Sequence, residues 1–297
     1  MIFTNQALAL FPPALGQAIA QTQRDRDELV EEICCRIGRP PVLLTQENVY
    51  HAACRAVLPD DLDYLLERAT GASVYAAGEQ IRQGYLQTAG GCRVGLCGCA
   101  YGQAAGQIDG IRQLSSVSVR IPHAVPGCAD ALVPQLMKDG FCSTLILSPP
   151  GGGKTTLLRE CVRRLSDQGL RISLMDERGE IAGLAEGMPQ FRIGRCTDIL
   201  EGCTKKQAAL MLLKTMSPAL VAMDEITSPE DIEAVALCAH CGTAVLAAAH
   251  AAGLNDLRRR PLYRRLLSLG VFERVLTIEQ KDGKRSYRME KTEGTTC

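Results

Sequence analysis

Short apolar runs alternate with segments of helical periodicity along the second half of the chain. The predicted strands are residues 143–148, 171–177, 219–226 and 243–250, and the predicted helices are residues 155–168, 208–216 and 229–242. Strands that alternate with helices predict an α/β domain with a parallel sheet covered on both faces. Residues 274–291 add two strand-like runs around Asp282 and Gly283, a pair typical of a hairpin turn.

The first part of the chain has a different pattern. Charged and apolar positions alternate at helical spacing over residues 24–36, and we expect further helices at 48–58 and 61–69. Residues 74–121 are rich in glycine, with short apolar runs typical of strands joined by tight turns. The pattern therefore predicts two domains, a small mixed α+β domain over residues 1–117 and the α/β domain over residues 118–297.

Composition narrows the functions open to such a chain. Lys plus Arg and Asp plus Glu number 33 each, so the formal net charge is zero, and the chain has no Trp. Nucleic-acid binding normally needs a basic excess and stacking aromatic residues, so we expect no nucleic-acid partner. No apolar stretch approaches the roughly 18–20 residues of a transmembrane segment, and the amino terminus lacks the basic start of a signal peptide. We expect a cytoplasmic protein that docks peripherally at a membrane.

Cysteine is frequent, with 14 residues in the chain. Cys238 and Cys241 form one C-x-x-C pair, without a second pair at the spacing of a zinc site. We expect most of the cysteines to be reduced, small and buried.

One predicted strand runs into a phosphate-binding sequence, SPPGGGKTT, which opens a predicted helix. In such a loop the backbone N–H groups and the helix dipole hold phosphates, the lysine reaches the terminal phosphates and the next hydroxyl holds magnesium. Ser148 stands where the usual pattern has glycine, and because serine is small we expect a distorted turn rather than loss of binding. The expected cofactors are ATP and Mg²⁺, since the sequence has no guanine-reading N-K-x-D motif. The residues assigned to the nucleotide are Ser148, Pro149, Pro150, Gly151, Gly152, Gly153, Lys154, Thr155 and Thr156, with Thr155 also on the metal.

Acidic residues end two of the predicted strands. Asp224 and Glu225 close the run LVAMDE, the pattern of a Walker B strand. We expect Asp224 to hold magnesium and Glu225 to orient or activate the attacking water. Asp176 and Glu177 close the run ISLMDE. Ligands sit at the carboxyl ends of strands in such sheets, so a place near the nucleotide is favoured here over an ordinary charged turn.

Together these segments resemble the stage III sporulation protein AA family of endospore-forming bacteria. The resemblance covers residues 90–274 and is carried by SSVSVRIPHAVPG, TLILSPPGGGKTTLLRE, LMDERGEIAG, the run from GMPQF to AMDEI, and GTAVLAAAH. It implies a mother-cell ATPase similar to the ATPases of type II and type IV secretion and pilus machines, with a loop that begins Ser-Pro-Pro. It also implies an acidic box at Asp176 and Glu177, with Glu177 among the catalytic candidates, and a histidine box at His250. His250 would sense the γ-phosphate; the alternative is a histidine that caps a strand end.

A ring ATPase also needs an arginine to stabilise charge on the transferring phosphoryl group. The candidates are Arg93, Arg120, Arg178, Arg192 and Arg195. We favour Arg120 and Arg195 as catalytic because they lie in the segments that match the family best. The basic run Arg258–Arg265 is interpreted as a solvated helix face.

The sequence therefore predicts a RecA-like P-loop ATPase domain preceded by a smaller mixed domain. The resemblance implies a homo-oligomeric ring, a hexamer, that energises a channel between mother cell and forespore through membrane proteins of the stage III sporulation channel. It places the protein in the mother-cell cytoplasm, at the membrane that faces the forespore. Two alternatives stay open: a RecA-like motor acting on nucleic acid, and a non-hydrolysing nucleotide-dependent scaffold, which would not need Glu225. A small-molecule kinase would need a lid-like arginine segment that the sequence does not offer.

Overall fold

The computed structural model describes residues 6–24, 26, 28–45, 47–71, 78–88, 91–102, 108–185, 187–281 and 284–292. The chain divides into two compact units, Met1–His123 with Gly183–Gln190, and Ala124–Ala182 with Phe191–Cys297. The boundary expected after Val117 falls inside strand β6, Gly110–Arg120, which belongs wholly to the first unit.

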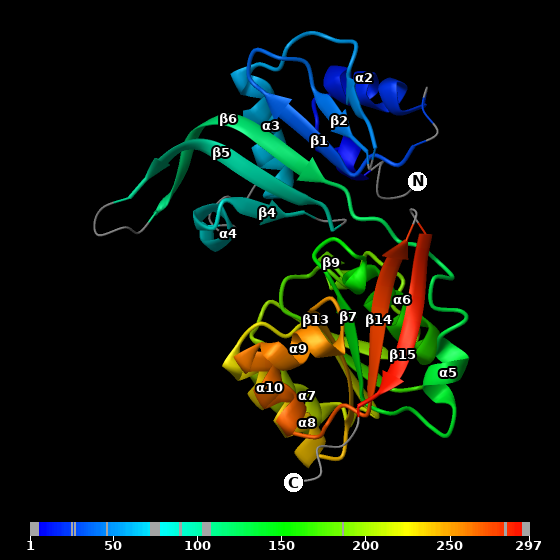
Figure 1. Ribbon diagram of the computed structural model, residues 1–297. Helices are drawn as coiled ribbons and strands as arrows, with labels where there is room; N and C mark the ends of the chain where they lie inside the picture. Colours follow the sequence, from blue (N-terminus) through cyan, green and yellow to red (C-terminus); the bar gives the residue numbers. More distant parts are fainter. Residues whose placement is uncertain are drawn as a thin grey trace. The chain divides into compact units, whose positions relative to one another are not determined.

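The first unit is built on an antiparallel sheet whose described strands follow the order β3-β2-β1-β6-β5-β4 (Figure 1). Its strands, besides β6, are β1 Glu32–Arg36, β2 Val42–Leu44, β3 Val49–His51, β4 Tyr85–Gln87 and β5 Arg93–Tyr101, and its helices are α2 Pro13–Arg24, α3 Pro59–Ala69 and α4 Gly78–Arg82. A short antiparallel pair, β9 Leu184–Ala185 and β10 Met188–Pro189, also belongs to this unit.

Two of the three helices predicted in the first unit are wrong. Residues 24–36 contain the last residue of α2 and then strand β1, and residues 48–58 contain strand β3. In β1 the three consecutive residues Ile33, Cys34 and Cys35 are all buried, and β2 and β6 pair with the strand along its two edges. Sheet pairing thus overrode the local charge pattern, as it often does for short segments. The third predicted helix, at 61–69, is confirmed as α3.

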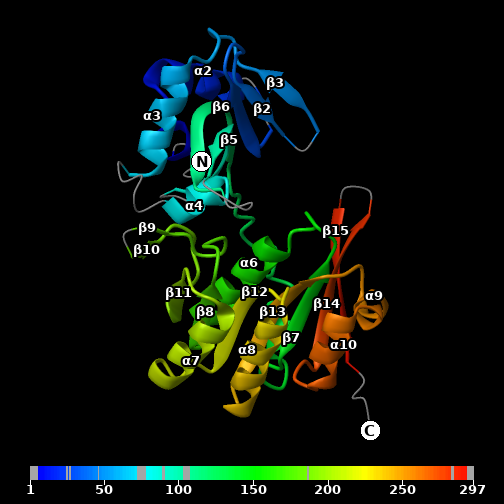
Figure 2. The same cartoon turned by 90° about the vertical axis from the view of Figure 1, so that its left-hand side faces the viewer.

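The second unit holds the predicted parallel sheet, in the strand order β11-β8-β12-β13-β7-β14-β15 (Figure 2). Its strands are β7 Thr144–Ser148, β8 Ile172–Asp176, β11 Thr197–Glu201, β12 Leu220–Glu225, β13 Ala244–His250, β14 Arg274–Lys281 and β15 Lys284–Lys291. Every neighbouring pair is parallel except β14 with β15, which form the predicted antiparallel pair. The turn predicted at Asp282 and Gly283 lies outside the described residues.

Helices cover both faces of this sheet. They are α5 Val133–Met137, α6 Lys154–Asp167, α7 Lys205–Thr215, α8 Pro229–His240, α9 Leu254–Arg259 and α10 Pro261–Ser268. Figure 1 shows α5 and α6 on one side of the sheet and the other four on the opposite side. The three central residues of β7, Leu145, Ile146 and Leu147, are fully buried between the two layers. No helix in the described part of the chain is long and apolar enough to cross a bilayer.

The strand order of the second unit brings the predicted site residues to one edge of the sheet. Strand β13 lies between β7, which leads into the phosphate loop, and β12, which ends in Asp224 and Glu225. Because all three strands are parallel, their carboxyl ends meet at one edge of the sheet, which is where such folds bind ligands.

Candidate functional site

The phosphate loop is a sharp turn from β7 into the amino end of α6. Gly151 and Gly153 have φ values of 73° and 92°, a left-handed conformation that favours glycine. The Gly152 N–H donates to the Pro149 carbonyl at 3.1 Å, and α6 begins at Lys154. Pro149, Pro150 and Gly151 are exposed, and the hydroxyl-bearing residues Thr155 and Thr156 are half-buried in the first turn of α6. The loop therefore offers exposed backbone at a helix amino terminus, the arrangement that binds phosphate.

Ser148 fits this loop through its partner Gly152. The serine is fully buried, and its hydroxyl donates to the Pro149 carbonyl at 2.7 Å. A Cβ placed on Gly152 would lie 1.9 Å from Ser148 Oγ and 3.0 Å from Ser148 Cβ. The serine side chain thus fills the space beside a glycine instead of distorting the turn.

Gly152→Ala is therefore expected to weaken ATP binding, and a second change, Ser148→Gly, to restore it. Overpacking of this kind costs about 1–3 kcal/mol, which corresponds to about 5- to 100-fold in Kd. Equilibrium titration with a fluorescent ATP analogue measures both variants, with Ser148→Gly alone as the control that should stay near wild type. Equal affinities of Gly152→Ala and the double variant would show that Ser148 is not the obstacle.

A chain of polar contacts joins the loop lysine to the acidic strand. Lys154 is buried, and its Nζ lies 2.5 Å from His250 Nδ1 and 3.4 Å from the Ser148 carbonyl oxygen. His250 Nε2 lies 2.8 Å from Glu225 Oε2. An ammonium group only donates, so His250 Nδ1 accepts from Lys154, and the Nε2–H of the imidazole is then the donor to Glu225. Burial is the main cause that lowers the pKa of Lys154, opposed by the charges of Glu225 and Asp224.

Asp224 is the residue before Glu225 at the carboxyl end of β12, and it is half-buried. Burial raises its pKa to about 6, with further repulsion from Glu180 and Asp176, while Lys205 acts in the opposite direction. A carboxylate that is partly desolvated and close to other carboxylates is a suitable ligand for a divalent cation. The positive charge of the cation offsets both the desolvation and the repulsion. Mg²⁺ is such a cation, and proteins usually bind it through one or two carboxylates plus substrate phosphates. The described residues hold no cluster of three or more His, Cys, Asp or Glu suited to a metal ion by itself.

The raised pKa of Asp224 makes a prediction about stability. The folded-state pKa of about 6 lies above the ordinary value of 3.8, so ionisation of Asp224 disfavours the folded state as the pH rises through this window. Asp224→Asn should raise the unfolding free energy of the metal-free protein by about 1–3 kcal/mol at pH 7.5 and by less at pH 4.5. Urea unfolding in EDTA measures it, with Asp198→Asn on the exposed face of β11 as the control. The same gain at both pH values would contradict the prediction.

Asp176, predicted to lie near the nucleotide, is bonded to the turn that follows its own strand. It is buried, and its carboxylate accepts the backbone N–H groups of Glu180, Ile181 and Ala182 at 2.9, 3.0 and 2.7 Å. Three backbone donors occupy both carboxylate oxygens, so Asp176 holds the turn that follows β8. This geometry does not support direct contact of Asp176 with the nucleotide.

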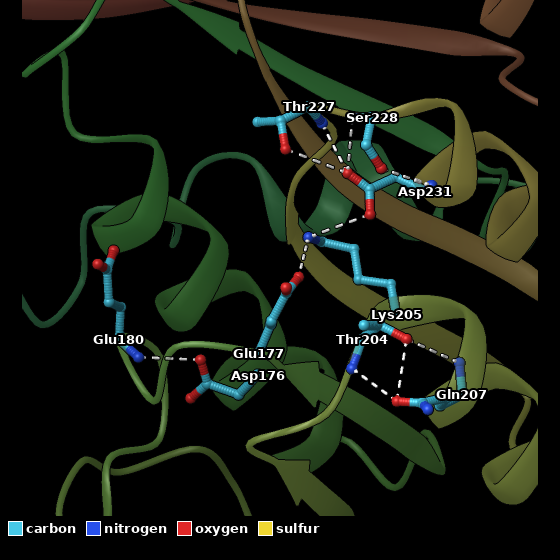
Figure 3. Close-up of polar contacts among 9 residues, drawn as sticks. All are labelled: Asp176, Glu177, Glu180, Thr204, Lys205, Gln207, Thr227, Ser228 and Asp231. Atoms are coloured by element: carbon cyan, nitrogen blue, oxygen red, sulfur yellow. Dashed lines mark hydrogen bonds and ion pairs between the residues drawn. The ribbon is translucent and has the colours of Figure 1, made fainter. Parts of the chain in front are cut away.

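Glu177 belongs to a cluster centred on a buried lysine (Figure 3). Lys205 Nζ lies 2.8 Å from Glu177 Oε2 and 3.4 Å from Asp231 Oδ1. Asp231 Oδ2 also accepts the N–H groups of Thr227 and Ser228 at 2.7 and 3.0 Å, at the start of α8. Lys205 thus links the residue that follows β8 to the start of α8, and its charge lowers the pKa of Asp224. Glu177 is therefore an ion-pair partner of Lys205.

The sequence analysis missed Lys205, although a signal for it exists. Lys205 is the first residue of α7, after the N-cap Thr204, where a positive charge opposes the helix dipole. A lysine in that position, which in the chain lies between the two acidic strand ends at Asp176 and Asp224, indicates that it has carboxylate partners.

The two arginines favoured as catalytic, Arg120 and Arg195, lie in different units. Arg120 ends β6 in the first unit, where its Nε lies 3.5 Å from Glu32 Oε2. Arg195 is exposed and donates to the Asp167 carbonyl at 2.9 Å. Asp167 is the last residue of α6, so Arg195 lies at the opposite end of that helix from the phosphate loop. A contact of Arg195 with the nucleotide of its own loop is therefore not supported.

The fold and the loop define the class of protein to which the chain is similar. The Legionella pneumophila ATPase DotB has a similar structure, with a TM-score of 0.61, 14% identity, and coverage of 93% of this chain and 78% of that chain. The pilus retraction motor PilT, solved with bound ADP, has a TM-score of 0.62 and 12% identity over 94% of this chain and 83% of that chain. The chain shares the α/β fold of these ATPases.

The chain belongs to the family described as sporulation stage III, protein AA, which matches residues 4–289. Stage III sporulation protein AA of Bacillus subtilis (strain 168) is 33% identical over 285 residues, which cover 94% of this chain and 92% of that protein. The resemblance noted from the sequence motifs is confirmed.

Proposed function

We propose that this protein binds ATP with Mg²⁺ and hydrolyses it to ADP and phosphate. The observation that carries the proposal is the contact chain from Lys154 through His250 to Glu225, which links a phosphate-binding lysine to a carboxylate placed to handle water. A chance glycine turn between a strand and a helix would not need such a chain. The ATPases DotB and PilT share the fold, which supports the proposal further.

Each residue has a defined part in this chemistry. The loop backbone and Lys154 bind the phosphates, and Thr155 and Asp224 hold Mg²⁺, which neutralises charge on the phosphoryl oxygens when bound. Glu225 orients the attacking water and accepts its proton. His250 keeps the Glu225 carboxylate in position through its Nε2–H.

His250 also couples the two ends of the site. Its Nδ1 accepts from Lys154 in the structure, and phosphates that draw the ammonium group toward themselves remove that donor. The imidazole then remains bonded to Glu225 alone. Occupancy of the phosphate loop is in this way transmitted to the group that handles water.

We further propose that the chain works as a subunit of a homo-oligomeric, hexameric ring in the mother cell, at the membrane facing the forespore. There it energises a secretion-like channel by acting on membrane proteins of the stage III sporulation system. Membership in the sporulation stage III, protein AA family supports this setting, and the fold shared with DotB and PilT supports a motor. In such a ring, Arg120 or Arg195 would serve the nucleotide of a neighbouring subunit, and for Arg195 the support is its place at the opposite end of α6 from the phosphate loop of its own chain.

Two measurements test whether the protein works as a ring. Phosphate release is measured over a range of protein concentrations, and sedimentation velocity with a non-hydrolysable ATP analogue reports the assembled species. Activity per subunit should rise as the assembled species appears, because one subunit completes the site of the next. Full activity from a monomer at every concentration would contradict the ring while leaving ATP hydrolysis intact.

A further inference from the structure

A residue outside the recognised motifs lies against the phosphate loop. Strand β14 pairs in parallel with β7, and β15 returns antiparallel to β14, with Arg285 opposite Gln280. Strand β15 therefore starts at the sheet edge where β7 ends and the loop begins. This topology brings Arg285, far along the chain, to the phosphate loop.

The contact between Arg285 and the loop is close. A Cβ placed on Gly153 would lie 3.2, 3.3 and 3.5 Å from Cζ, Nη1 and Nε of Arg285. Three guanidinium atoms at nearly equal distances show that the guanidinium group faces this glycine. Gly153 is the N-cap of α6 and has a φ of 92°, so glycine here both permits the turn and leaves room for the arginine.

The positive charges around the phosphate loop favour binding of an anion. The amino end of α6 is a positive dipole end, and Lys154 and Arg285 add two cationic side chains. Across the described residues, no ion pair or hydrogen bond of the Arg285 side chain is found, whereas Arg288 on the same strand lies 3.0 Å from Glu279. A ligand with several negative charges satisfies all three positive groups at once.

We propose that Arg285 is a nucleotide-binding residue that holds the part of the ligand shared by ATP and ADP, the α- and β-phosphates. The inference rests on the proposed nucleotide site and deepens it. Phosphate loops hold the α- and β-phosphates with their backbone, which here includes Gly153, and reach the γ-phosphate with lysine. In the sheet, His250 and Glu225 end strands on one side of β7, and Arg285 begins a strand on the other side. Arg285 therefore binds and does not take part in hydrolysis.

Arg285→Gln and the control Arg288→Gln test this assignment with fluorescent ATP and ADP analogues at equilibrium. Arg285→Gln should weaken both nucleotides by about 10- to 100-fold, the effect of losing a charge-assisted hydrogen bond to phosphate. Its kcat at saturating ATP should stay within about twofold of wild type, as for a lost contact equal in ground and transition states. Arg285→Lys should lie between the two, because it keeps the charge without the planar fork. Arg288→Gln should bind as wild type does.

Arg285 is exposed, so its replacement should leave thermal unfolding unchanged and the variant folded. Wild-type affinity of Arg285→Gln for both nucleotides would overturn the inference and leave the proposed function standing. A fall in kcat with unchanged affinities would also overturn it, since Arg285 would then act on the γ-phosphate. If the wild type and Lys154→Ala bind neither nucleotide, the proposed function fails and the inference fails with it.

Discussion

Glu225→Gln is expected to lower kcat for ATP hydrolysis by about 10²- to 10⁴-fold, the usual contribution of a positioned general base. Glutamine keeps the size of the side chain and an oxygen that accepts the Nε2–H of His250, so the contact at 2.8 Å can persist. What it loses is the negative charge and the ability to accept a proton from water. ATP affinity should therefore stay within about threefold of wild type, as for a group that acts in the transition state.

Phosphate release at saturating ATP and an equilibrium titration with an ATP analogue measure these two effects. Glu279→Gln serves as the control, because Glu279 lies in the same sheet and pairs with Arg288 on the surface. Near wild-type turnover by Glu225→Gln would remove Glu225 from the chemistry. A loss of binding equal to the loss of turnover would make it a structural residue.

Lys205→Met is expected to lower the free energy of unfolding by about 3–5 kcal/mol, the usual cost of removing one partner from a buried ion pair. The side chain of Lys205 is 6% exposed and that of Asp231 is 8% exposed. The variant therefore leaves the buried carboxylate of Asp231 without its cationic partner. Glu177, at 39% exposure, recovers part of its hydration, which favours the lower end of the range. The same variant should raise the pKa of Asp224 further, since Lys205 lowers it in the wild type.

Lys206→Met is a matched control one residue away. Lys206 pairs with Glu233 at 2.7 Å, but the two side chains are 46% and 44% exposed, so its loss should cost no more than about 1 kcal/mol. Urea unfolding of both variants at pH 7.5 gives the comparison. Equal stabilities of the two variants would show that the buried cluster in Figure 3 does not hold β8 and α8 together.

Local pattern predicted most of the second unit because its elements follow local rules. The β7 sequence is an unbroken apolar run, α6 opens after three glycines, and β12 ends in two carboxylates, so each element is specified by its own residues. His250 was placed at a strand end and lies there, bonded to Lys154 and Glu225. The sequence alone left open whether it caps the strand or serves the site.

What sequence could not predict depends on partners far along the chain. Residues 32–36 form a strand that pairs with β2 and β6. The local sequence EICCR does not predict this pairing, because the partner strands lie elsewhere in the chain. Asp176 and Asp224 look alike as strand ends, yet three backbone N–H groups hold the first, while burial and acidic neighbours raise the pKa of the second. Arg285 reaches the phosphate loop only through the order of strands in the sheet.

The most direct test of this account is Mg²⁺-dependent ATP turnover by the purified wild-type protein, measured as phosphate release with and without EDTA. Lys154→Ala, made in the same background, sets the baseline. We expect turnover that needs Mg²⁺, disappears in EDTA and is absent from Lys154→Ala. A wild-type protein that binds ATP but releases no phosphate, even when concentrated enough to assemble, would contradict the account and favour a nucleotide-dependent scaffold.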